Sequence, residues 1–144
     1  MKTKTLFTSC GTLLLALFWS SCVWAQIQIG TDIDGEAAIN FSGSSVSLDG
    51  HRVAIGAPTN DDAGYRAGHV RIYEWNGANW TQMGADIDGE AASDESGHVV
   101  SLDGNRVAIG APLNAGNGSG SGQVRIYEWN GTTWTQMGAD IDGQ

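Results

Sequence analysis

Acidic side chains spaced around glycines are the residues of this chain best suited to chemistry. The segment Asp-Ile-Asp-Gly occurs three times, at residues 32–35, 86–89 and 140–143, and a glutamate follows the first two copies. Hard cations such as Ca²⁺ bind several carboxylate and carbonyl oxygens supplied by a tight loop. The candidate Ca²⁺ ligands are Asp32, Asp34, Glu36, Asp86, Asp88, Glu90 and Asp94. A solvated turn is the simpler alternative, because Asp and Gly are common turn residues.

Catalytic chemistry has little support in the sequence. The three histidines, His51, His69 and His98, do not recur at the matching positions of the repeat described below, which excludes a zinc site common to both repeats. No nucleophile elbow, phosphate-binding glycine loop or Cys-x-x-Cys pair occurs. We therefore predict no catalytic residue and no enzyme activity. The alternative is that the chain forms part of a larger secreted hydrolase or lyase.

The acidic segments belong to a longer sequence repeat. Residues 30–83 and 84–137 align without a gap, and 37 of the 54 positions are identical. Repeats of roughly 20–50 residues or slightly longer are typical of propellers, solenoids and arrays. Residues 26–29 match the end of a repeat, and residues 138–144 match the beginning of one. We expect two whole units, flanked by the end strand of a preceding unit and the start of a third.

Each repeat contains four short runs with strand character and no helical period. In the first repeat they are residues 44–49, 52–57, 69–75 and 80–83, and the second repeat has them 54 positions later. Alternating apolar and polar side chains indicate half-buried strands, and Asp49-Gly50 favours a tight turn. Four-stranded units covered on both faces are propeller blades. The predicted fold class is all-β, a partial β-propeller of two four-stranded blades with flanking partial-blade segments. A linear β array is the alternative.

Two short motifs in each repeat resemble the FG-GAP repeat, the blade motif of integrin α-subunit propellers and of many secreted bacterial proteins. Gly56-Ala57-Pro58 and its copy at residues 110–112 match the Gly-Ala-Pro half, and Ser42-Gly43 stands in place of Phe-Gly. The resemblance implies a propeller, a cell-surface location, ligand binding or adhesion, and Ca²⁺ in some blades. The integrin-type Ca²⁺ loop does not carry over, because the connection at residues 48–51 is too short to wrap an ion.

Residues 1–25 are predicted to be a secretory signal peptide. Lys2 and Lys4 precede the apolar run at residues 13–19, and the segment ends in Val-Trp-Ala. The apolar run is shorter than the roughly 20 residues that cross a bilayer, so we expect no transmembrane span. We predict a secreted or cell-surface protein. Lipid anchoring through Cys22 is disfavoured, because Trp19 stands where the lipoprotein box requires an aliphatic residue.

The charge of the remaining chain restricts its partners. Residues 26–144 hold five arginines, no lysine and all 16 acidic residues, a formal net charge of −11. So acidic a chain repels phosphate backbones, which excludes nucleic acid as the expected partner. Both cysteines precede residue 26, so no disulfide is expected. Open sheet edges would also favour self-association.

The differences between the repeats indicate where a ligand would bind. The largest group of them, seven of 17, lies in the loops at residues 59–67 and 113–121, whereas most strand positions repeat. We predict a secreted or surface-displayed binding or adhesion scaffold whose partner is a protein or glycan ligand. A fragment of a longer propeller protein without independent activity is the alternative. Trp75, Trp80, Trp129 and Trp134 recur in register, which favours packing over carbohydrate stacking.

Overall fold

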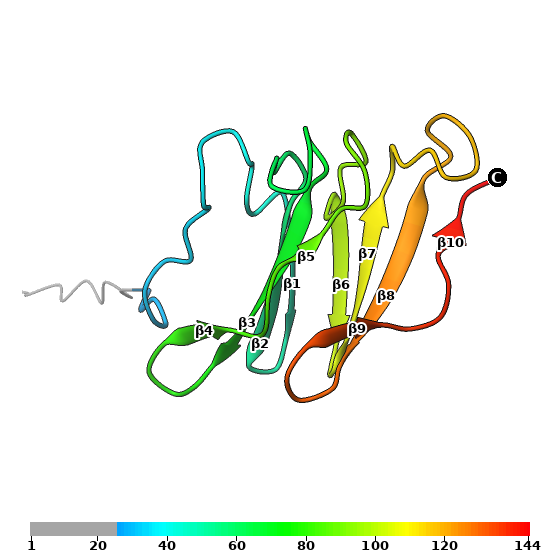
Figure 1. Ribbon diagram of the computed structural model, residues 1–144. Helices are drawn as coiled ribbons and strands as arrows, with labels where there is room; N and C mark the ends of the chain where they lie inside the picture. The colour runs from blue at the N-terminus through cyan, green and yellow to red at the C-terminus, as the bar shows by residue number, and fades with distance from the viewer. Residues whose placement is uncertain (1–25) are drawn as a thin grey trace, which may run out of the picture.

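Strands are the only regular elements of residues 26–144, the part of the chain that the structure, a computed structural model, describes (Figure 1). The predicted signal peptide and Cys22 lie outside these residues. The strands are β1 (Ser45–Asp49), β2 (Arg52–Ala57), β3 (His69–Trp75), β4 (Trp80–Gln82), β5 (Ile87–Asp88), β6 (Val99–Asp103), β7 (Arg106–Ala111), β8 (Gln123–Trp129), β9 (Trp134–Gln136) and β10 (Ile141–Asp142). They form two antiparallel sheets, which confirms the predicted all-β class of blade-like units.

The first three strands of each sheet form an antiparallel meander. β1 pairs with β2, and β2 pairs with β3 along its whole length. The β1–β2 turn places Gly50 at φ 56°, a left-handed conformation that glycine adopts without steric cost. β6, β7 and β8 repeat this arrangement in the second sheet. The strands predicted from alternation agree with the observed ones to within one residue at each end.

The outer edge of each sheet is shared by two short strands. β4 pairs with the end of β3 at Tyr73–Trp75, and β5 pairs with its beginning at His69–Val70. β9 and β10 divide the edge of β8 in the same way. The acidic segment at residues 86–89 is therefore partly a strand that completes the first sheet, and its copy at residues 140–143 completes the second.

The two sheets stand side by side and pack face to face (Figure 1). β6 lies against β1 and β2 of the first sheet, and a single core fills the space between the sheets. Its buried members are Ala54, Val70, Ile72, Met83, Ile87, Val100, Leu102, Val107 and Ile109. Burial of these apolar side chains between sheets is the main force that holds the two units together.

A pair of tryptophans lies at the lower end of each sheet, and one indole of each pair donates a hydrogen bond to the preceding segment of the chain. The rings of Trp129 and Trp134 lie 5.4 Å apart, and the Trp134 indole donates a hydrogen bond of 2.8 Å to the carbonyl of Met83 in the first sheet. Trp80 donates in the same way to Ile29, at 3.2 Å. Trp129 and Trp134 also pack against the core, in line with the packing role predicted for the tryptophans. The residues 26–29 form no strand with another segment of the described chain.

Candidate functional site

Two of the predicted acidic ligands meet at a buried histidine. His69 is the first residue of β3, and its side chain is only 1% exposed. Its Nδ1 lies 3.5 Å from Asp86 Oδ2, just before β5, and 3.7 Å from Glu36 Oε2, in the segment before β1. The pairing of β3 with β5 brings Asp86 close to His69. The segment before β1 lies beside the start of β3 and brings Glu36 there as well. We call Glu36, His69 and Asp86 the histidine–carboxylate cluster.

Arg71 flanks this cluster on β3. Its Nη1 lies 3.8 Å from Glu36 Oε1, and its Nη2 donates a hydrogen bond of 2.8 Å to the carbonyl of Asp34. The guanidinium also lies 5.7 Å from the centre of the Tyr73 ring, a cation–π distance. Two buried polar atoms remain without a hydrogen-bond partner among the described residues, His69 Nδ1 and Arg71 Nε. Unpaired buried polar atoms are uncommon, so each one requires a physical explanation.

Burial changes the acidity of two neighbours of the cluster. Loss of solvent raises the pKa of the Asp88 carboxyl, and the negative charge of Asp86 raises it further, against a smaller lowering by His69. Loss of solvent also raises the pKa of the Tyr73 hydroxyl, against the lowering effect of Arg71. Both shifts favour the neutral form of the group. The region around β3 and β5 therefore disfavours additional negative charge.

The second sheet contains the same arrangement with one decisive change. Gln123 occupies the position of His69, and its amide donates a hydrogen bond of 2.9 Å to Glu90 Oε2. Arg125 Nη1 lies 3.8 Å from Glu90 Oε1, as Arg71 does from Glu36. Asp140 is the counterpart of Asp86. The amide of Gln123 has a partner here, whereas the ring nitrogen of His69 does not.

The other predicted ligands have separate local roles. Asp32 accepts a hydrogen bond of 2.7 Å from the Gln28 amide, and the backbone carbonyls of Asp34 and Asp88 accept from arginines of the two sheets. Asp94 is buried, and its Oδ2 accepts hydrogen bonds from the Ala91 N–H and the Asn114 amide. The structure therefore brings Glu36 and Asp86 together at His69, whereas the carboxylates of Asp32 and Asp94 bond to other residues.

His69 was not predicted as a ligand, because no histidine stands at the matching position of the second repeat. The missing signal was available in the repeat itself. His69 replaces a glutamine at the start of a buried strand, opposite carboxylates that both repeats retain. Three ligand atoms of Glu36, His69 and Asp86 lie within 4.8 Å of one another, close enough for one metal ion to contact all three.

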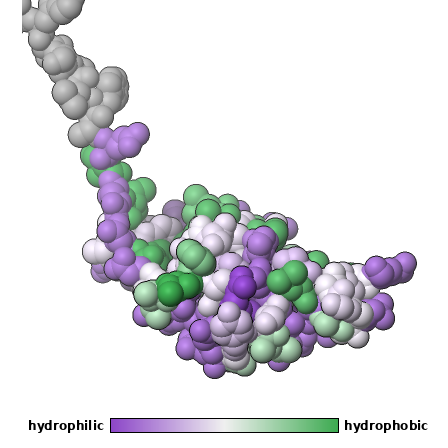
Figure 2. Space-filling model, turned by 90° about the horizontal axis from the view of Figure 1, so that it is seen from above, coloured by the Kyte–Doolittle hydropathy of each residue, from purple (hydrophilic) through white to green (hydrophobic). Residues whose placement is uncertain are grey.

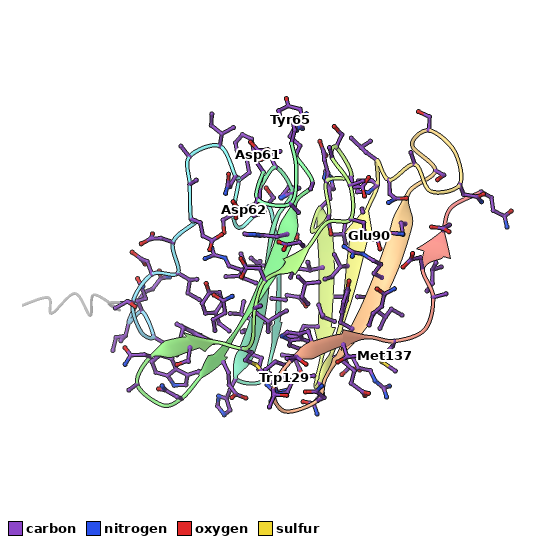
Figure 3. All side chains as sticks on the ribbon, in the orientation of Figure 1. Asp61, Asp62, Tyr65, Glu90, Trp129 and Met137 are labelled. Atoms are coloured by element: carbon purple, nitrogen blue, oxygen red, sulfur yellow. The ribbon has the colours of Figure 1, made fainter. Side chains whose placement is uncertain are left out.

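A second candidate surface is formed by the variable loops at the upper end of the molecule. Their bases are the same: Asn60 and Asn114 are both buried, and each side-chain oxygen accepts a backbone hydrogen bond of 2.8 Å two residues later. Their tips differ. Tyr65 is 68% exposed at the tip of the first loop, where Figure 3 places it beside Asp61 at the upper rim, and the second loop has Ser119 there.

The family of the chain follows from its repeated blades. The family model described as the FG-GAP repeat matches residues 24–73 and 86–127. The chain belongs to the FG-GAP repeat family. It is therefore a propeller-like repeat domain, as the sequence motifs predicted. No curated protein matches the chain. Within residues 26–144 there is no helix that could cross a bilayer.

The FG-GAP motifs have a clear structural purpose at the junction of the two sheets. Gly56, in the Gly-Ala-Pro half, lies directly beneath the carbonyl of Gly97, in the other half of the next repeat. The Ser45 hydroxyl donates a hydrogen bond of 2.7 Å to that same carbonyl. Gly97 itself adopts φ 85° against His69 and Val70. The two glycines allow the backbones of neighbouring blades to approach closely.

Proposed function

We propose that this protein is a non-enzymatic binding or adhesion scaffold, exported to the cell surface or beyond, which contacts a protein or glycan ligand through its upper loops. The observation that carries the proposal is a constant loop frame with variable tips. Binding residues are commonly placed on loops that a rigid β scaffold positions. Export is supported by the sequence of residues 1–25, and adhesion is supported by the FG-GAP family resemblance.

The frame is held by identical contacts in both copies. Gly68 N–H donates to the carbonyl of Asn60, and Gly122 N–H donates to the carbonyl of Asn114, each at 3.0 Å. The chain can therefore change residues 61–66 and 115–120 without changing how the strands are joined. Figure 2, which shows this end of the molecule, has apolar patches beside strongly hydrophilic ones.

The first loop has the side chains expected of a ligand contact. Tyr65 offers a large exposed ring at a low cost in conformational entropy, and tyrosine is enriched among residues that dominate binding energy. Asp61 and Asp62 add negative charge beside it, whereas the second loop has Ala115 and Gly116. This composition favours a ligand that presents basic or hydrogen-bond donor groups.

Transplanting the tip of the second loop tests the proposal. In the variant, residues 61–66 are replaced by the sequence of residues 115–120. Attachment of protein-coated beads to panels of immobilised matrix proteins and glycans is the measurement. We expect the variant to lose at least about tenfold in attachment to the surface that the native protein binds, because the exposed tyrosine and its carboxylates are removed.

A smaller change separates ligand contact from loop stability. The transplant also removes Arg66, which pairs with Glu95 across the two sheets. Tyr65→Ser keeps that pair and removes only the exposed ring, so it should weaken attachment at an unchanged melting temperature. If both variants attach as well as the native protein, the upper loops are not the contact surface.

A further inference from the structure

The orphaned nitrogen of His69 points to a ligand that neither the repeat family nor the variable loops suggest. Its Nδ1 is fully buried, has no hydrogen-bond partner within residues 26–144, and faces one oxygen from each of two carboxylates. We propose that the histidine–carboxylate cluster, Glu36, His69 and Asp86, binds a divalent transition-metal ion of the Zn²⁺ class. The proposal stands apart from the loop-binding function and has its own test.

The distances from His69 Nδ1 to the two carboxylate oxygens suit such an ion. Metal bonds of about 2.1 Å to nitrogen and oxygen in a tetrahedral site separate the ligand atoms by about 3.4 Å. The two measured distances from His69 Nδ1 are 3.5 Å to Asp86 and 3.7 Å to Glu36. A bound ion would therefore change the distances from His69 Nδ1 to the two carboxylates by only a few tenths of an ångström.

The remaining oxygen of each carboxylate is already held. Arg71 lies beside Glu36 Oε1, and the Gln82 amide donates a hydrogen bond to Asp86 Oδ1. Glu36 Oε2 and Asp86 Oδ2 are thereby left facing the histidine. Outer partners that orient ligating carboxylates in this way are a regular feature of metal sites. Both carboxylates are partly exposed, which gives an ion access and leaves room for a water ligand.

The choice of ion follows from the ligand set. Imidazole nitrogen suits Zn²⁺ and its transition-metal neighbours, whereas Ca²⁺ binds oxygen ligands. The pair of negative charges also compensates the two positive charges of the ion. The Ca²⁺ predicted from the acidic segments would bind to the carboxylates alone. Binding of Ca²⁺ would therefore not depend on His69, whereas binding of Zn²⁺ would.

The second sheet shows why a histidine is required. Gln123 fills the same space, and its amide nitrogen is occupied by the hydrogen bond to Glu90. An amide N–H donates and does not ligate a metal ion through nitrogen. Since Glu90 and Asp140 match Glu36 and Asp86, the two sheets differ at this site by the one residue that supplies a nitrogen ligand.

Exchange of these two residues provides a matched test. Titration calorimetry with zinc chloride, in a buffer free of phosphate, is expected to show one binding site in the native protein. His69→Gln reproduces the residue of the second sheet and should weaken Zn²⁺ binding by more than about tenfold, because even the loss of an outer partner of a ligand commonly costs that much. Gln123→His should add a second site. The double exchange should return the count to one.

The other outcomes would overturn the proposal. Absence of Zn²⁺ binding by the native protein at micromolar concentration would do so, as would equal affinity in the His69→Gln variant. Circular dichroism checks that each variant is folded. Calcium chloride serves as the comparison ion. Displacement of Zn²⁺ by an equal concentration of Ca²⁺ would show an oxygen-only site and would also contradict the proposal.

A different observation concerns the two outer faces of the molecule. Leu102 is 7% exposed because its sheet packs on the first, whereas its counterpart Leu48 is 69% exposed. On the opposite side, Ile87 is 5% exposed and its counterpart Ile141 is 56% exposed. Apart from exchanges such as Val99 for Ser45, each open face therefore presents the counterparts of the residues in one half of the buried junction.

We infer that a second copy of this chain docks head to tail, with its β1 against β6 and β7 of the first copy. The existing junction, in which β6 lies against β1 and β2, is the template. The receiving face already has an apolar hollow, lined by Val99, Ala108, Gly110, Val124 and Ile141. Such a contact uses different surfaces on the two copies, so it continues into rings or filaments.

Gly110 permits a test that leaves the monomer intact. It corresponds to Gly56, where the carbonyl of Gly97 leaves no room for a side chain. At Gly110 there is room, because the nearest atom to an added Cβ is the Val99 Cβ, 3.6 Å away. Gly110→Ala should therefore block docking of a second copy without disturbing its own fold. In sedimentation velocity at micromolar concentration, we expect native protein to form species larger than a monomer, and the variant to remain monomeric.

The control is Ala115→Ser on the upper loop, which should associate as the native protein does. A native protein that remains monomeric throughout the micromolar range would overturn the inference. Association of Gly110→Ala to the same extent as the native protein would also overturn it, because the contact would then lie elsewhere on the surface.

Discussion

Alanine in place of Gly56 is expected to lower the free energy of unfolding by about 3 kcal/mol, the upper part of the usual range for overpacking a filled interior. The added Cβ would overlap the Gly97 carbonyl of the neighbouring sheet and the Ser45 hydroxyl. The carbonyl belongs to the backbone, so it cannot rotate away. In urea titrations followed by tryptophan fluorescence, the midpoint should fall while the slope remains unchanged.

Gly110→Ala is the matched control for this change, measured at concentrations low enough to keep the protein monomeric. Gly110 has the same sequence neighbours and the same strand position, but no sheet covers it. Glycine within a strand costs roughly 0.5–1 kcal/mol relative to alanine, so the control should be neutral or slightly stabilising. Equal destabilisation by both changes would show that the glycine serves its own strand and not the junction between blades.

Most of this fold was predictable, because its strands and turns are indicated by local sequence patterns that occur in both repeats. Alternation of apolar side chains in β1 and β6, and the glycines after each first strand, predicted the strands to within one residue. The divided outer edge was not predicted. β5 has two residues, and only Ile87 is apolar, so no period can be read from it. Its strand character comes from pairing with β3, which is a tertiary contact.

The sites were predictable to a lesser extent, for a related reason. Acidic residues were recognised by type, but their neighbours depend on which segments the sheets bring together. Glu36 and Asp86 are 50 positions apart, and His69 lies between them in sequence. No local pattern indicates that these three would meet. Comparison of the two repeats, position by position, recovers part of this information, because retained carboxylates with one exchanged partner mark a difference in chemistry.

The repeats therefore provide internal controls as well as an architecture. Positions that agree, such as Asn60 and Asn114, form the frame of the blade. Positions that differ are found both at the surface and in the interior. The tip residue Tyr65 faces solvent, whereas His69 is buried. A residue exchanged in the interior affects the hydrogen bonding of its neighbours more than one exchanged at the surface. The reason is that no water is present in the interior to replace a lost hydrogen bond.

Leu102→Ala is expected to cost about 2–5 kcal/mol of unfolding free energy, the range for a buried leucine that leaves a cavity. Leu102 lies in the core between the sheets, whereas Leu48 occupies the same position of the first repeat and is largely exposed. Leu48→Ala should therefore cost less than about 1 kcal/mol in the monomer. Urea denaturation of both variants at low protein concentration gives the comparison.

Raising the protein concentration distinguishes burial within the chain from burial between copies. If the open face of β1 docks on a second copy, Leu48 becomes buried there as Leu102 is buried now. The cost of Leu48→Ala should then grow with protein concentration, while the cost of Leu102→Ala should not, because binding of a partner stabilises the folded state by mass action. Equal costs for both substitutions at low concentration would contradict the burial difference on which the inter-sheet core and the head-to-tail contact both depend.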